Sequence, residues 1–110
     1  MKGTHLGEFE ELVLLSVGAL TDDAYGVTIK DFITDKTGRS PSIGALHSAL
    51  SRLENKGFLN INIGEATKVR GGRRKKYYII TIAGKEALRV INDQRSEILN
   101  MIPNLNFAVI

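Results

Sequence analysis

The chain has 110 residues, of which 43% are hydrophobic and 25% charged, a length and composition typical of one globular domain. Its longest apolar stretch, residues 12–20, is too short to cross a bilayer, the first residues contain no apolar export signal, and cysteine is absent. We therefore expect no membrane partner and no disulfide framework, and a protein that works in a reducing cytoplasm.

The net charge of +3 is unevenly distributed along the chain. Six of the nine residues from 68 to 76 are basic and none is acidic, whereas the remainder holds nine basic against twelve acidic residues, a balance of −3. A cationic segment on an acidic body creates a local positive potential of the kind that attracts nucleic acid. A solvated, disordered charge run is the alternative, and the flanking sequence decides between the two. The six basic residues are Lys68, Arg70, Arg73, Arg74, Lys75 and Lys76.

The first predicted helix spans residues 7–20. Three glutamates fill its first turn, where carboxylates stabilise the positive end of the helix dipole. Apolar residues occupy one face, beginning at Phe9, and most of the other side as well. A helix that is apolar nearly all round is covered from more than one direction. In a chain this short, the pattern indicates burial against a second subunit.

Two further helices are predicted over residues 24–37 and 42–56. Gly38 and Gly57 follow them at positions that favour glycine, and Ser42 is a natural N-cap for the third helix. Apolar spacing predicts which residues of each helix face the core. These are Tyr25, Ile29, Phe32 and Ile33 in the second helix, and Ile43, Leu46, Ala49, Leu50 and Leu53 in the third.

The opposite face of the third helix has a composition suited to a DNA groove. Small and hydrogen-bonding side chains predominate there, and no carboxylate appears before Glu54. Such a helix brings little bulk into the groove and is not repelled by phosphate. The residues of this face are Gly44, Ala45, His47, Ser48, Ser51, Arg52 and Asn55.

After Gly57 the apolar period changes from that of a helix to that of a strand. Residues 59–63 alternate between apolar and polar types, and residues 77–82 are rich in aromatic and β-branched types, so both segments are predicted strands. The basic segment lies between them and is therefore the tip of a hairpin. Three helices followed by a hairpin with a basic tip form the winged-helix plan. A winged helix that contacts only proteins is the alternative, and the six cations disfavour it.

The last predicted helix begins at Thr81 or at Ala83-Gly84 and runs to about Ile102, before Pro103. Its apolar stripe has steps of 4, 3, 4, 3 and 4 residues, the spacing of a coiled coil interrupted by one arginine. We therefore expect it to pack on a partner subunit. The stripe consists of Gly84, Leu88, Ile91, Arg95, Ile98 and Ile102.

Other motifs fit specific chemistry less well. Gly71-Gly72 between two arginines resembles an anion nest, but it does not lead from a strand into a helix as phosphate-binding loops do. Neither His5 nor His47 has a nearby group of cysteines or carboxylates that would complete a metal site. No motif places a nucleophile beside a base, so we expect neither a cofactor nor enzyme activity. Tyr25 is either a core residue or, through its hydroxyl, a contact to a DNA phosphate.

Together these segments resemble the PadR-type transcriptional regulators over about residues 6–90. The resemblance implies a winged-helix domain with a C-terminal dimerisation helix, usually a repressor at an inverted-repeat operator, and the short C-terminal helix is similar to the small-domain branch. Many members have tyrosine where this chain has His47, so their base preference does not transfer. The motifs are residues 6–10 (LGEFE), 24–26 (AYG), 42–46 (SIGAL), 50–58 (LSRLENKGF) and 71–78 (GGRRKKYY), then Thr81 and Gly84.

The fold class expected is therefore mostly α with a β-hairpin wing, as one compact domain. Residues 1–82 form the winged helix, and residues 83–110 form the dimerisation helix and a short tail. We expect a homodimer that inserts two third helices into successive major grooves of double-stranded DNA. The expected DNA-binding residues are Ser42, His47, Ser48, Ser51, Arg52, Lys68, Arg70, Arg73, Arg74, Lys75, Lys76 and Tyr25.

A second hypothesis is a small-molecule sensor with a ligand site at the dimer seam. Some members of the small-domain branch bind aromatic compounds between subunits, although this chain has no tryptophan to stack on one. The cavity would be lined from the first and last helices by Phe9, Ile91, Ile98 and Met101. The residues expected at the dimer or effector site are Phe9, Leu88, Ile91, Arg95, Ile98, Met101 and Ile102.

Overall fold

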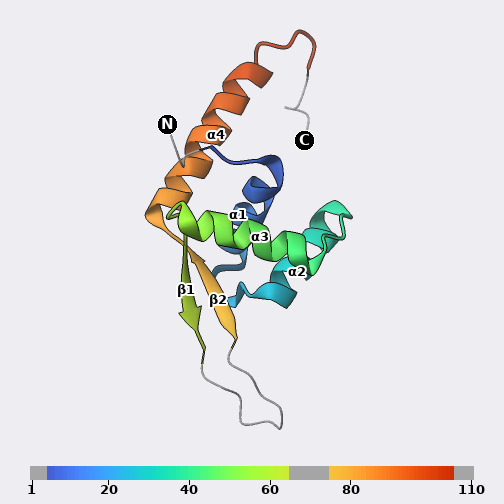
Figure 1. Cartoon of the computed structure of the whole chain (residues 1–110). Helices are drawn as coiled ribbons and strands as arrows, with labels where there is room; N and C mark the ends of the chain where they lie inside the picture. The colour runs from blue at the N-terminus through green and yellow to red at the C-terminus, as the bar shows by residue number, and fades with distance from the viewer. Residues whose placement is uncertain (1–4, 65–74, 106–110) are drawn as a thin grey trace.

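The computed structural model describes residues 5–64 and 75–105. Three helices form a body, and a two-stranded hairpin and a fourth helix extend from it in opposite directions (Figure 1). This arrangement confirms the predicted fold class of helices with a hairpin. The elements are α1 (Glu8–Leu20), the short 3-10 turn η1 (Thr21–Asp23), α2 (Gly26–Thr37), α3 (Ile43–Asn55), β1 (Leu59–Ile63), β2 (Lys76–Ile80) and α4 (Ile82–Leu99).

The first helix, α1, is covered on several sides by its own chain. It contacts α2, α3, β2 and α4, and Val13, Leu14 and Val17 are fully buried. The hydroxyl of Ser16, also buried, donates to the carbonyl of Leu12 at 2.8 Å, so the polar group is satisfied inside the core. The chain itself therefore covers most of the apolar surface of α1, whereas Leu15 is 48% exposed, and burial of that side against a second subunit stays a prediction.

The boundaries of α2 and α3 follow the capping residues in the sequence. Gly38 ends α2 in the left-handed conformation at φ 77°, and the Ser42 hydroxyl accepts from the Ala45 N–H at 3.1 Å at the start of α3. At its other end Gly57, at φ 82°, closes a Schellman motif in which the Phe58 N–H donates to the Leu53 carbonyl at 2.9 Å. These predictions are confirmed.

The core stripe of α3 is confirmed except at its first position. Leu46, Leu50 and Leu53 are fully buried, whereas Ile43 is 52% exposed. At 100° per residue Ile43 lies only about 20° round the helix from the fully buried Leu50, so its exposure follows from its place in the first turn, at the end of the helix. Its apolar type placed it in the predicted core, and that prediction is wrong.

The hairpin is antiparallel, with Ile61 opposite Tyr78 and Leu59 opposite Ile80. Leu59 and Tyr78 are buried against the body. The far end leaves the body, so Ile63 is 59% exposed although its predicted alternation assigned it to the apolar face. Burial raises the pKa of the Tyr78 hydroxyl, and the negative charge of Glu54 raises it further. The phenol is therefore neutral at physiological pH.

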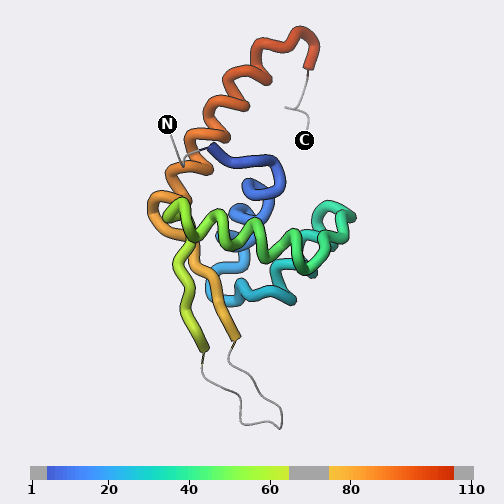
Figure 2. The backbone as a smooth tube through the Cα atoms, in the orientation of Figure 1, coloured from blue at the N-terminus to red at the C-terminus, as the bar shows by residue number. Residues whose placement is uncertain are grey.

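The chain passes from β2 into α4 with only Thr81 between them (Figure 2). The Thr81 hydroxyl accepts from the Gly84 N–H at 3.0 Å and caps the helix, which confirms the earlier of the two predicted starts. Ile82, predicted to end the strand, is instead the first residue of α4 and is 86% exposed. The helix ends at Leu99, one turn before the predicted Ile102.

The apolar stripe of α4 is divided between two environments. Gly84 is buried, and Leu88 and Ile91 pack against the core of the same chain. Ile98 and Ile102, further along, are 62% and 47% exposed. Coiled-coil spacing therefore serves packing within the chain in the first half of the helix, where a partner subunit was expected along its whole length.

Candidate nucleic-acid interface

The outward face of α3 is the first part of the candidate site. It lies opposite the buried stripe, with Gly44, Ser48 and Ser51 near its centre, while His47 and Arg52 flank it on either side at 100° per residue. All five residues are exposed. The structure therefore brings the predicted helix residues onto one accessible, hydrogen-bonding surface.

One flank of α3 is tied to α1 by ion pairs. Glu10 of α1, with a side chain only 13% exposed, lies 2.6 Å from the ammonium of Lys56 and 4.0 Å from the guanidinium of Arg52. Lys56 also donates to the carbonyl of His5 at 2.6 Å. Arg52 thus lies between a carboxylate behind it and the open surface in front, with a side chain still 62% exposed.

The hairpin is the second part of the candidate site. Lys75 and Lys76 are exposed at the start of β2, where the strands have left the body. The positions of the other predicted wing cations, Lys68, Arg70, Arg73 and Arg74, lie outside the described residues.

Tyr25 connects the hairpin with the start of α2. The ammonium of Lys75 lies 4.4 Å from the centre of the Tyr25 ring and donates to its hydroxyl at 3.4 Å. The rings of Tyr25 and Tyr77 meet edge to face, with centroids 5.3 Å apart at 74°. The hydrogen bond to Tyr25 raises the pKa of Lys75. Tyr25 is half-buried, so it is not a fully buried core residue, and contact of its hydroxyl with a DNA phosphate stays a prediction.

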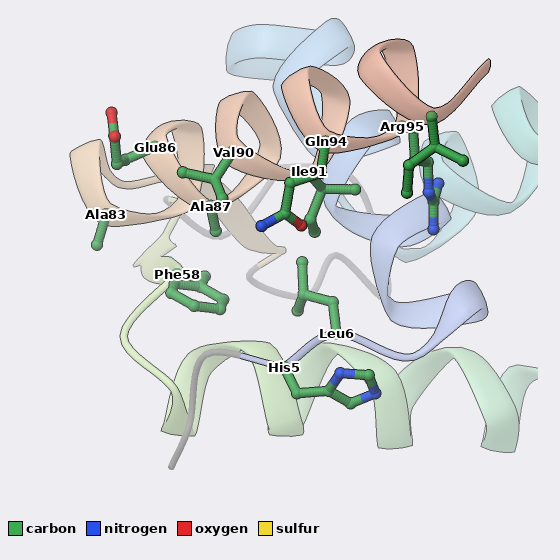
Figure 3. A pocket seen from close by; sticks show the side chains of 11 residues that line it. His5, Leu6, Phe58, Ala83, Glu86, Ala87, Val90, Ile91, Gln94 and Arg95 are labelled. Atoms are coloured by element: carbon green, nitrogen blue, oxygen red, sulfur yellow. The ribbon is translucent and has the colours of Figure 1, made fainter. Parts of the chain in front are cut away.

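A hollow of about 700 Å³ lies between α4 and the segment before α1 (Figure 3). Leu6 and Phe58 form one wall, and Val90 and Ile91 point toward them from α4. Ile98 also lines it. Ile91 and Ile98 therefore lie together as predicted for an effector site.

Phe9, also predicted for an effector cavity, does not line this hollow. It lies beside Arg39 at the start of α3, with the guanidinium 5.4 Å from the ring centre, because α1 turns this residue toward the α2–α3 connection. Met101, 75% exposed, lies beyond the end of α4 and outside the lining of the hollow. Arg95 lines the hollow and binds Glu11 of α1 at 2.6 Å, which joins α4 to the body.

Comparison with known proteins defines the family. A sequence profile of the transcriptional regulator PadR-like family matches residues 14–90. The chain belongs to the PadR-like family. No curated protein sequence matches the chain.

Several solved structures share the fold along most of their length. A PadR-like transcription factor of Bacteroides fragilis is 25% identical over 82% of both chains, with a TM-score of 0.69. A transcriptional regulator of Clostridium thermocellum is 26% identical over 86% of this chain and 92% of its own, with a TM-score of 0.67. A Streptococcus mutans protein is 30% identical over 81% and 76%, with a TM-score of 0.64. The fold is therefore a PadR-like winged helix, and the protein is a DNA-binding transcription regulator.

Two contacts near the PadR-like interface were not predicted. Lys75 and Tyr77 are two positions apart, so strand geometry places both on the same face, toward Tyr25. The alternation of side chains along a strand could have predicted that they share this face. The pairing of Glu10 with Lys56 joins residues 46 positions apart, and no local pattern indicates it.

Within the described ranges no group of three or more metal-ligating side chains is found, and no helix is long and apolar enough to cross a membrane.

Proposed function

We propose that this PadR-like regulator is a homodimeric repressor that binds an inverted-repeat operator through α3 and the hairpin. The observation that carries the proposal is the exposed face of α3, whose side chains are small or hydrogen-bonding and include no carboxylate until its last turn. A helix of this composition enters the major groove without repulsion from phosphate. The regulator acts in the cytoplasm, where its DNA target lies, and the proposal assigns it no catalysis.

The two elements have different tasks in this proposal. His47, Ser48 and Ser51 of α3 present imidazole and hydroxyl groups that hydrogen-bond to base edges, with Arg52 beside them. The wing cations bind phosphates, which gives affinity without sequence preference. The helix therefore discriminates between sequences, and the wing supplies the salt-dependent part of the binding free energy. Ser42, exposed at the N-cap of α3, is proposed to contact a phosphate at the edge of the groove.

The homodimer is supported by the exposed end of α4. A monomer that exposes several large apolar side chains at the end of one projecting helix and in the residues after it leaves surface that a second copy would cover. A symmetric dimer then spaces two α3 helices for successive major grooves, about 34 Å apart. The exposed residues are Ile98, Leu99, Met101, Ile102 and Leu105.

The wing is tested by a salt titration of DNA affinity. If each half-site engages about three phosphates, log K against log salt has a slope near about −5, at about −0.9 per phosphate. The double variant Arg73→Ala, Arg74→Ala is expected to weaken binding to every duplex and to make the slope shallower by about 2 to 4. Fluorescence anisotropy with a selected operator and with a scrambled duplex measures both effects.

The matched control is the double variant Lys36→Ala, Lys85→Ala, which removes the same charge from exposed positions on α2 and α4. It is expected to keep the wild-type slope within about 1. An unchanged affinity and slope in the arginine variant would remove the wing from the proposal. Equal losses in both double variants would show that only net charge matters.

The hollow beside α4 supports a second candidate function, sensing of a small aromatic compound. Its volume of about 700 Å³ lies within the range of small-molecule sites. Its walls are mainly apolar, and the polar side chains among them are His5, Glu86, Gln94 and Arg95. Such a ligand changes DNA affinity only if it binds the free and DNA-bound dimers differently.

The sensing function is tested with 2-naphthoate as the probe. We expect millimolar or tighter binding by calorimetry and a shift in operator affinity of at least about threefold, which Val90→Trp abolishes by filling the hollow. Ser96→Trp, on the opposite face of α4, is the control and retains both effects. Binding that Val90→Trp leaves unchanged would exclude this hollow as the site.

A further inference from the structure

We infer that Tyr25, Lys75 and Tyr77 form a clamp that sets the direction of the wing relative to α3. Tyr25 is then a positioning residue for DNA binding that acts through the wing cations. This inference rests on the proposed DNA-binding function of the wing, and it assigns to Tyr25 and Lys75 a task other than direct contact with phosphate.

The clamp combines three contacts on one face of the hairpin. The Lys75 ammonium lies 4.4 Å from the Tyr25 ring centre and 3.4 Å from its hydroxyl oxygen. The Tyr77 ring lies edge to face against the same tyrosine at a centroid distance of 5.3 Å. Tyr25 is therefore held by a cation and by an aromatic ring, both from the part of the hairpin where β2 begins.

Gly64 allows Tyr77 to take part in the clamp. A methyl group at Gly64 would lie 2.9 Å from Cε2 of the Tyr77 ring, closer than any real contact permits. The Gly64 N–H also donates to the Lys75 carbonyl at 2.8 Å, which continues the hairpin pairing past the last residue of β1. The ring of Tyr77 thus lies over the end of β1 while its edge contacts Tyr25.

The backbone around Tyr25 is itself fixed at two points. The Tyr25 N–H donates to the Thr28 hydroxyl at 3.0 Å, and its carbonyl accepts from the Ile29 N–H at 2.8 Å, which holds it at the start of α2. The adjacent Ala24 carbonyl accepts from the Tyr78 N–H at 2.8 Å. The side-chain clamp and this backbone bond connect the same two segments, the start of α2 and β2.

The position of the clamp gives it leverage over the wing. An isolated two-stranded hairpin is marginally stable and has no intrinsic direction relative to a domain. Here the strands lose contact with the body toward Ile63, which is 59% exposed, and Lys76, also exposed. The clamp lies at this point of departure. A change in its geometry therefore moves the described end of the hairpin, including Lys75 and Lys76, relative to α3.

Variants of Tyr25 separate positioning from direct contact. Tyr25→Phe keeps the ring that Lys75 and Tyr77 contact and removes only the hydroxyl, so it is expected to bind DNA within about twofold of the wild type. Tyr25→Leu removes the ring and is expected to weaken binding about tenfold. It is also expected to make the salt slope shallower by about 1 to 2, although no charge is removed, because wing cations lose their phosphates.

Variants of Lys75 keep the inference testable if Tyr25→Leu does not fold, because Lys75 is exposed. Lys75→Met is expected to match Tyr25→Leu, and Lys75→Arg, which also stacks on a ring, is expected to restore binding. In the combined variant Tyr25→Leu, Lys75→Met the two losses are expected not to add. Anisotropy measures affinity and slope, and urea unfolding reports the stability of each variant.

Three outcomes would overturn the clamp. A large loss in Tyr25→Phe would make the hydroxyl a direct phosphate contact, and additive losses would make Lys75 an independent one. A loss of affinity that tracks the unfolding free energy, with an unchanged salt slope, would reduce Tyr25 to a fold-stabilising residue. Failure of the proposed function is distinguishable, because the wild-type slope would then be insensitive to Arg73→Ala, Arg74→Ala as well.

Discussion

Gly44 and Gly84 both lie within the first turn and a half of a helix, but an added methyl group meets different surroundings at the two positions. At Gly44 no atom lies within 4 Å of it, whereas at Gly84 the Phe58 carbonyl oxygen would lie 2.5 Å away and Cγ1 of Ile80 2.9 Å away. Alanine is favoured over glycine in helices by up to about 1 kcal/mol. The surroundings therefore decide the sign of each substitution.

Gly84→Ala is expected to lower the free energy of unfolding by about 1–3 kcal/mol, because the Phe58 backbone cannot yield as a side chain would. Gly44→Ala, the matched control, is expected to raise it by up to about 1 kcal/mol. Urea unfolding at one protein concentration measures both. Stabilisation by Gly84→Ala would show that α4 can move away from Phe58 at little cost in free energy.

The same glycine shows what the sequence predicts at the scale of one residue. Gly84 was assigned to the inner stripe of the last helix, which is confirmed, since spacing along a helix is a local property. Its need to be glycine depends on Phe58, which lies 26 positions earlier and meets it only after the hairpin forms. Close approaches of this kind depend on tertiary structure, so no local pattern contains them.

At the scale of elements, helix ends were predicted better than helix partners. Ser42 and Gly57 bound α3 because their caps involve residues within five positions of each other. The surface that covers the apolar stripe of a helix, by contrast, depends on residues distant in the sequence. Ile43 is exposed where a core residue was expected, and Leu88 packs on its own chain where a partner was expected. Periodicity identifies an apolar face without specifying what covers it.

The candidate interface divides in the same way. The exposed face of α3 was predicted from composition, because one helix carries all of its residues. The contacts at the start of β2 were predicted in part. Lys75 and Tyr25 were each assigned to DNA binding, but their contact with each other, across 50 positions of sequence, was not predicted. Whether such a cation faces phosphate or a tyrosine ring depends on how β2 lies against the start of α2.

At the scale of the whole molecule, the shape is extended. The radius of gyration is 16.1 Å, against roughly 13 Å for a compact domain of this length. The excess arises because the hairpin and α4 project in opposite directions from a small body (Figure 1). One projection is the proposed wing, and the other exposes apolar side chains. In the proposed homodimer through α4, each hairpin would lie at the end of its subunit away from the seam.

Ile98, 62% exposed on the far half of α4, tests this assembly. Ile98→Glu is expected to change a dimer into a monomer in size-exclusion chromatography with light scattering, because a buried, unpaired carboxylate destabilises an apolar seam. Ser96→Glu places the same charge on the opposite face of α4 and is expected to remain dimeric.

In the proposed homodimer, assembly also raises DNA affinity, which gives this prediction a second measurement. Once one half-site is bound, the linked second subunit meets its own half-site at an effective concentration of the order of millimolar. A monomer loses this advantage, so Ile98→Glu is expected to bind a full operator at least about a hundredfold more weakly than the wild type. Its affinity for a single half-site should stay unchanged, because α3 and the wing are intact. A monomeric Ile98→Glu that binds the full operator as tightly as the wild type would exclude simultaneous binding of two half-sites.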